Sequence, residues 1–126
     1  MSDKYGPNSA QVEAFLALLP TLTDEQWEVV RRHGQPWAPE RSFDSYRAWY
    51  SAYAATYHIP RRFGLAAARS AAWIAARDAA RAGAGLAAEA AAALVIRGLI
   101  SREHFDALTA PMRAAGIDFD KLEVAR

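Results

Sequence analysis

The chain has 126 residues and a formal net charge of +1, with 15 lysines and arginines against 14 aspartates and glutamates. This length is typical of one domain that folds without metal or disulfide staples, and the absence of cysteine excludes disulfides and thiol chemistry. The balanced charge provides no global field that would attract nucleic acid or a membrane. We expect a cytoplasmic protein, because no signal peptide is visible.

The N-terminal third predicts two short helices. Residues 1–8 are polar, contain glycine and proline, and are expected to be a flexible N-terminus. Ser9 is placed to cap a first helix over residues 9–19, in which apolar residues share one face, and Pro20 ends it. The run Thr-Asp-Glu-Gln then has the spacing of a capping box, which predicts a second helix over residues 23–34.

A third helix is expected over residues 42–58 and has the sharpest amphipathic pattern in the chain. Its aromatic rings fall within an arc of about 120° on a helical wheel. We interpret these rings either as core side chains that pack against alanine, or as the lining of a groove, an interface or a pocket for a flat apolar ligand. The residues of this aromatic stripe are Tyr46, Trp49, Tyr50, Tyr53 and Tyr57.

Residues 65–82 predict a helix with two contrasting sides. One side is almost pure alanine, which lets another helix approach near the short end of the usual axial distance of about 8–10 Å. The opposite side is basic, and Asp78 is the single acid in residues 58–82. This basic ridge suits phosphates or an acidic partner protein, although a solvated arginine face is the simpler interpretation. The ridge lies within residues 61–81 and contains Arg62, Arg69, Trp73, Arg77 and Arg81.

Residues 86–100 are apolar on every side of a helical wheel, and Glu89 and Arg97 are their only charged residues. A helix that is apolar all round is buried. The segment is also shorter than the roughly 20 residues that span a bilayer. We therefore predict the buried central helix of a bundle and no membrane association.

The C-terminal part predicts short elements. Ser101 is placed to cap a helix over residues 102–108. Because proline is tolerated in a first helical turn, Pro111 predicts a separate turn over residues 112–115, ended by Gly116. The tail, residues 117–126, is expected to be partly ordered through the apolar anchors Ile117, Phe119, Leu122 and Val124.

These elements predict an all-α fold, a compact bundle of five or six helices in a single domain over residues 9–116. No catalytic constellation is found, so we do not expect an enzyme. No histidine has a metal-binding spacing, and the Gly83-x-Gly85 turn lacks the lysine and preceding strand of a phosphate loop, so we expect neither metal nor cofactor.

The leading interpretation is a non-enzymatic interaction module that binds a protein partner or forms a homo-oligomer. Two alternatives remain open. The basic ridge would bind nucleic acid, in which case binding would depend strongly on salt. The aromatic stripe would instead bind a small apolar ligand.

Two segments of the chain resemble known sequences. Ala-Trp-Ile-Ala-Ala-Arg-Asp-Ala-Ala-Arg at residues 72–81 and Ala-Leu-Val-Ile-Arg-Gly-Leu-Ile-Ser-Arg-Glu-His-Phe-Asp-Ala-Leu-Thr-Ala-Pro-Met at residues 93–112 resemble small alanine-rich helical proteins of GC-rich bacteria and their phages. The thirty alanines, and the thirteen arginines among the 15 basic residues, accord with GC-rich coding. The resemblance implies a bacterial or phage accessory or regulatory protein, and it implies no particular activity.

Overall fold

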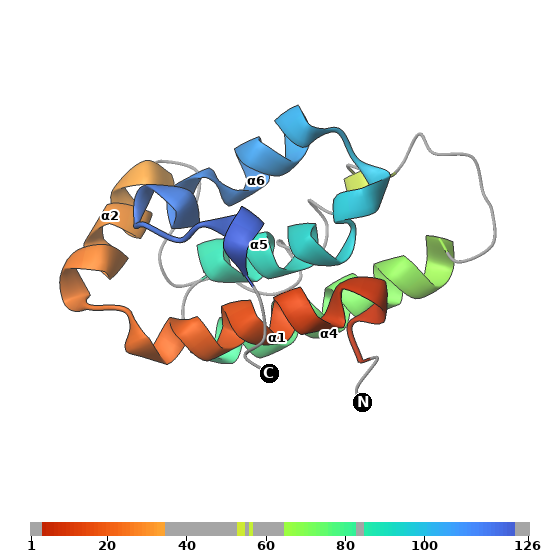
Figure 1. Cartoon of the computed structure of the whole chain (residues 1–126), viewed down its shortest axis with the longest axis horizontal. Coiled ribbons are helices and arrows are strands. Elements are labelled where there is room, and N and C mark those ends of the chain that lie inside the picture. Colours follow the sequence, from red (N-terminus) through yellow and green to blue (C-terminus); the bar gives the residue numbers. More distant parts are fainter. Residues whose placement is uncertain (1–3, 35–52, 55, 57–64, 83–84, 123–126) are drawn as a thin grey trace.

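The computed structural model describes residues 4–34, 53–54, 56, 65–82 and 85–122, and these residues form an all-α bundle (Figure 1). The predicted fold class is therefore confirmed. The helix expected over residues 42–58 lies almost entirely outside the described residues. The described α-helices are α1 (Ser9–Leu18), α2 (Asp24–Gly34), α4 (Leu65–Ala82), α5 (Gly85–Val95) and α6 (Arg102–Ala114). The 3₁₀ turns beside them are η1 (Gly6–Asn8), η2 (Leu19–Thr21), η3 (Arg97–Leu99) and η4 (Phe119–Lys121).

Helix α5 is the centre of the bundle and contacts α1, α2, α4 and α6. Helices α1 and α4 lie along one side of it and α6 along another (Figure 1). Every side chain in residues 86–96 is buried, including that of Glu89. The predicted burial on all sides is confirmed for this stretch. Among the helices described, none combines the length and apolar character that a bilayer crossing requires.

Helix α5 is shorter than the helix predicted over residues 86–100. It ends at Val95, and the backbone of Ile96, with φ −99° and ψ 14°, leads into the turn η3. Within this turn, Arg97 Nη1 donates to the Phe119 carbonyl oxygen at 3.1 Å. This contact joins the turn to the tail, 22 residues further along the chain.

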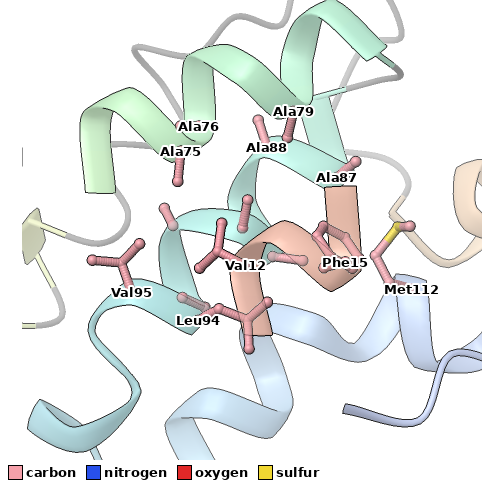
Figure 2. Packing of buried hydrophobic residues seen from close by; sticks show 14 of the residues in the cluster. Val12, Phe15, Ala75, Ala76, Ala79, Ala87, Ala88, Leu94, Val95 and Met112 are labelled. Carbon is pink, nitrogen blue, oxygen red and sulfur yellow. The ribbon is translucent and has the colours of Figure 1, made fainter. Parts of the chain in front are cut away.

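The contact between α4 and α5 is built from alanine on both helices. Figure 2 shows methyl groups of the two helices in one cluster with side chains of α1 and α6. Alanine loses no side-chain entropy on folding, and its small side chain lets helix axes approach closely. The predicted alanine side of residues 65–82 is therefore confirmed in its central part. The buried alanines of α4 are Ala71, Ala72, Ala75, Ala76 and Ala79.

The start of α1 differs from the prediction, whereas the end of α1 and the start of α2 agree with it. Ser9 is not the cap of α1, because η1 precedes the helix and places Asn8 at the N-cap, while Ser9 Oγ accepts a hydrogen bond from the Tyr5 amide at 2.9 Å. Helix α1 ends before Pro20, as predicted. The capping box at residues 23–26 is formed, with reciprocal hydrogen bonds of 2.9 and 3.1 Å.

Helix α6 runs without interruption, whereas a helix over residues 102–108 and a separate turn over residues 112–115 were predicted. Pro111 lies inside it, at a position where proline costs about 3 kcal/mol. Both Pro111 and Met112 are buried, and burying a methionine side chain contributes about 1.5–3 kcal/mol. Burial against the core therefore offsets the lost helical hydrogen bond.

Side chains and a glycine define the ends of α6, as predicted. Ser101 Oγ accepts from the His104 amide at 3.0 Å and caps the first turn. Gly116 has φ +105°, a backbone conformation that residues with a side chain rarely adopt. The amide of Ile117 then donates to the Met112 carbonyl oxygen at 3.3 Å, which closes the last turn.

Both terminal segments pack on the bundle where the structure describes them. Residues 4–8 differ from the expected flexible N-terminus, because Tyr5 is buried and Asn8 Nδ2 donates to the Leu94 carbonyl oxygen at 2.8 Å. In the tail, the Phe119 ring centre lies 5.3 Å from that of Phe15. The predicted anchors Ile117, Phe119 and Leu122 are buried, whereas Val124 lies outside the described residues.

Replacing Ala75 with leucine tests the packing of α4 against α5. Ala75 is fully buried, so the added methylene groups should lower the free energy of unfolding by about 1–3 kcal/mol. The matched control is Ala67→Leu at an exposed position of the same helix, which should change the free energy of unfolding by less than about 0.5 kcal/mol. Urea denaturation followed by circular dichroism measures both. Equal effects at the two positions would show that this contact is loosely packed.

Candidate functional site

The structure places three members of the basic ridge on the outer face of α4. Trp73 is 37% exposed, and the side chains of Arg77 and Arg81 are 42% and 72% exposed. They follow one another at intervals of four residues, so they lie one above the other on the helix surface. Arg62, the remaining arginine at the start of the ridge, lies outside the described residues.

Arg69 is turned into the fold and does not extend this surface. Its Nε donates to Thr56 Oγ1 at 3.0 Å, and its Nη2 donates to the Thr56 carbonyl oxygen at 2.9 Å. The guanidinium carbon also lies 4.3 Å from the centre of the Tyr53 ring, a cation–π distance. Arg69 therefore fastens these two residues to α4, and the ridge is divided between a structural arginine and an exposed face.

Asp78 brings the N-terminal segment to the exposed face of α4. Tyr5 Oη donates to Asp78 Oδ2 at 2.6 Å, and Lys4 Nζ lies 3.1 Å from the same oxygen. On the other side, Arg77 Nη2 is 3.4 Å and Arg81 Nη1 is 4.0 Å from Asp78 Oδ1. We refer to these five residues as the Asp78 cluster. Four of its side chains thus converge on one carboxylate.

The environment keeps Tyr5 protonated and Asp78 ionised. Burial raises the pKa of Tyr5 well above its ordinary value, and the hydrogen bond to Asp78 raises it further. Burial alone would also raise the pKa of Asp78, but the hydrogen bonds from Tyr5 and Lys4 outweigh it, so the pKa of Asp78 is lowered. At neutral pH the cluster therefore holds three cations around one anion.

Arg77 is incompletely satisfied within the cluster. A guanidinium has five N–H donors. Its bond to Asp78 is long at 3.4 Å, and in the described part of the chain its Nε is buried without a hydrogen-bond partner. The exposed part of this side chain therefore retains donor capacity for another acceptor.

A second cluster of charged residues connects the tail with residues at and before the start of α6, and its role is structural. Asp120 accepts from Arg97 Nη2 at 2.6 Å and from Arg102 Nη2 at 2.9 Å, and these two arginines lower the pKa of Asp120. Arg102 Nε also donates to Asp106 at 3.1 Å. The arrangement holds η4 against the beginning of α6.

The aromatic stripe is not tested by these observations. Tyr46, Trp49, Tyr50 and Tyr57 lie outside the described residues, and Tyr53 is half-buried beside Arg69. A pocket or interface at the stripe stays a prediction. Across the described ranges, no group of three or more histidine, cysteine, aspartate or glutamate side chains is placed to hold a metal ion.

Sequence reasoning found Trp73, Arg77 and Arg81 as a set because helical spacing alone brings them together. It missed Lys4 and Tyr5 as their neighbours, since Tyr5 and Asp78 are 73 residues apart in the chain. An aromatic residue in an otherwise polar N-terminal segment, and a single acid among the arginines of residues 58–82, are the two local signals for this contact.

Comparison with known proteins supplies no relative: the chain matches no protein-family model, no curated protein and no solved structure. The resemblance to small alanine-rich helical proteins of GC-rich bacteria and their phages therefore stays a prediction. Function must be argued from the residues themselves.

Tyr5→Phe tests the hydrogen bond that anchors the N-terminal segment. The substitution keeps the buried ring but removes the hydroxyl that donates to a charged carboxylate, so the free energy of unfolding should fall by about 2 kcal/mol. Lys4→Gln is the matched control, because Lys4 is half-exposed and its ion pair contributes less than about 1 kcal/mol. Denaturant unfolding compares the two. A larger loss for Lys4→Gln would contradict the anchoring role of Tyr5.

Acidification should remove the stability that ionised Asp78 contributes. Since its folded pKa lies below the ordinary aspartate value of about 3.9, the contribution is present above that value and is lost as the pH falls through the folded pKa. The difference in unfolding free energy between wild type and Asp78→Asn should therefore shrink between about pH 6 and about pH 2. Thermal unfolding across this range measures it. A constant difference would show that the charge of Asp78 is unimportant.

Proposed function

We propose that this chain is a non-enzymatic protein-interaction module that binds its partner through the outer face of α4. The observation that carries the proposal is the partly exposed Trp73, followed at one-turn intervals by the exposed side chains of Arg77 and Arg81. Tryptophan and arginine are enriched among the residues that supply most of the binding energy at protein interfaces. The resemblance described above favours an accessory or regulatory role in a bacterium or phage.

The packing of α4 supports this choice. Its alanine side is buried against α5, so the backbone that carries Trp73 is held in place before any partner arrives. A preorganised surface loses less conformational entropy on binding than a mobile one. The face of α4 therefore has both suitable side chains and a rigid support.

The two alternatives have weaker support. Nucleic-acid binding would use the whole ridge as a row of phosphate contacts, but Arg69 is bonded to Thr56 inside the fold and Asp78 places a negative charge among the remaining cations. The small-ligand pocket depends on Tyr46 and Tyr50, which lie outside the described residues. A protein partner is the interpretation that uses the residues in the positions where they are found.

Site-specific photo-crosslinking tests the proposal. A photoreactive phenylalanine analogue at position 73 should form covalent adducts with a partner protein in cells that express the chain naturally. The same analogue at position 18 is the matched control, because Leu18 is similarly exposed, at 36%, on a different helix. Mass spectrometry identifies the adducts, and an adduct with a second copy would identify a homo-oligomer. If position 73 forms no more protein adducts than position 18, the proposal is wrong.

A further inference from the structure

The face of α4 carries more positive charge than its own carboxylate neutralises. Lys4, Arg77 and Arg81 surround Asp78, so three cationic side chains meet one carboxylate at this place. Lys4 belongs to this group only because the neighbouring Tyr5 is buried and bonded to Asp78 at 2.6 Å. The fold therefore adds a third cation to a surface on which helical spacing alone places two.

The two arginines of this group retain donors for a second acceptor. The side chain of Asp78 is only 15% exposed, whereas those of Lys4, Arg77 and Arg81 are about half exposed or more, so the cations form the outer layer and the anion the inner one. Arg81 reaches Asp78 only at 4.0 Å, and Arg77 only at 3.4 Å. An incoming carboxylate can accept from both arginines without displacing a short bond.

We infer that the Asp78 cluster and Trp73 together bind an acidic segment of a partner protein, whose carboxylates contact Lys4, Arg77 and Arg81 while an apolar side chain packs on Trp73. This inference rests on the proposed function and specifies its partner. Four residues of α-helix rise about 6 Å, so the segment presents an apolar residue and an acid at that separation. Residues one helical turn apart on an acidic amphipathic helix satisfy this spacing.

A protein is favoured over a nucleic acid by the distribution of charge. The ionised Asp78 beneath the cations repels any incoming anion, and the total repulsion is larger for a closely spaced row of phosphates than for a few separated carboxylates. The whole chain has a net charge of only +1, which provides little of the long-range attraction on which nucleic-acid binding depends. The local excess of positive charge suits a local acidic contact.

The test uses a labelled helical peptide with glutamate and leucine one turn apart, and fluorescence anisotropy measures its binding to the full chain. The comparison probes are the same peptide with lysine in place of glutamate, and a single-stranded oligothymidine. The acidic peptide should bind, and its binding should weaken as salt rises. The lysine peptide should not bind, and the oligothymidine should bind at least about tenfold more weakly than the acidic peptide, for the charge reasons above.

Substitutions locate the site. Arg77→Gln and Arg81→Gln should each weaken binding of the acidic peptide about fivefold or more, and Trp73→Ala should weaken it about tenfold. Lys4→Gln should have a smaller effect of about twofold. Arg32→Gln is the matched control, because Arg32 is exposed on α2 and lies outside the cluster, so its loss should leave binding unchanged. Circular dichroism of each variant confirms that the fold is retained.

Three results would overturn the inference. The first is no binding of the acidic peptide at about 1 mM, the weak limit of specific binding. The others are tighter binding of the oligothymidine than of the acidic peptide, and an equal loss of peptide affinity for Arg32→Gln and Arg77→Gln. The crosslinking experiment separates this failure from that of the proposed function. Protein adducts at position 73 without binding of the acidic peptide would overturn only the acidic character of the partner. Failure of both experiments would overturn the inference and the proposed function together.

Discussion

The close approach of α4 and α5 is the constraint on which the rest of the structure depends. Alanine faces alanine along much of this contact, and larger side chains from other elements complete the core around it. Phe15 of α1 and Met112 of α6 do so around the pair (Figure 2), and Phe119 of the tail packs on Phe15. The bundle is therefore a tightly paired hairpin of helices covered by bulkier neighbours.

Burial of α5 on all sides decides where the described part of the chain can act. A central helix in contact with α1, α2, α4 and α6 has no side left for a partner. Helix α4 differs, because its alanine side is buried and its opposite side reaches the surface with Trp73 and two arginines. One helix thus combines a packing side with the exposed surface through which we propose that a partner binds.

Sequence reasoning succeeded where structure depends on nearby residues. Helical periodicity predicted the boundaries of residues 65–82 and the burial of residues 86–96, and the capping box predicted the start of α2. It failed for contacts between residues far apart in the chain: Arg97 donates to a carbonyl group in the tail, and Tyr5 donates to Asp78. The grouping of Trp73, Arg77 and Arg81 was therefore predictable from the sequence, and the contribution of Lys4 was not.

The hydrogen bond from Tyr5 to Asp78 also fixes where the polypeptide enters the bundle. Lys4 lies 3.1 Å from the same carboxylate, so the described chain starts beside Arg77 and Arg81. An affinity tag or fusion partner at this end is tethered close to the face of α4 that we propose binds a partner, and an acidic one would compete for it.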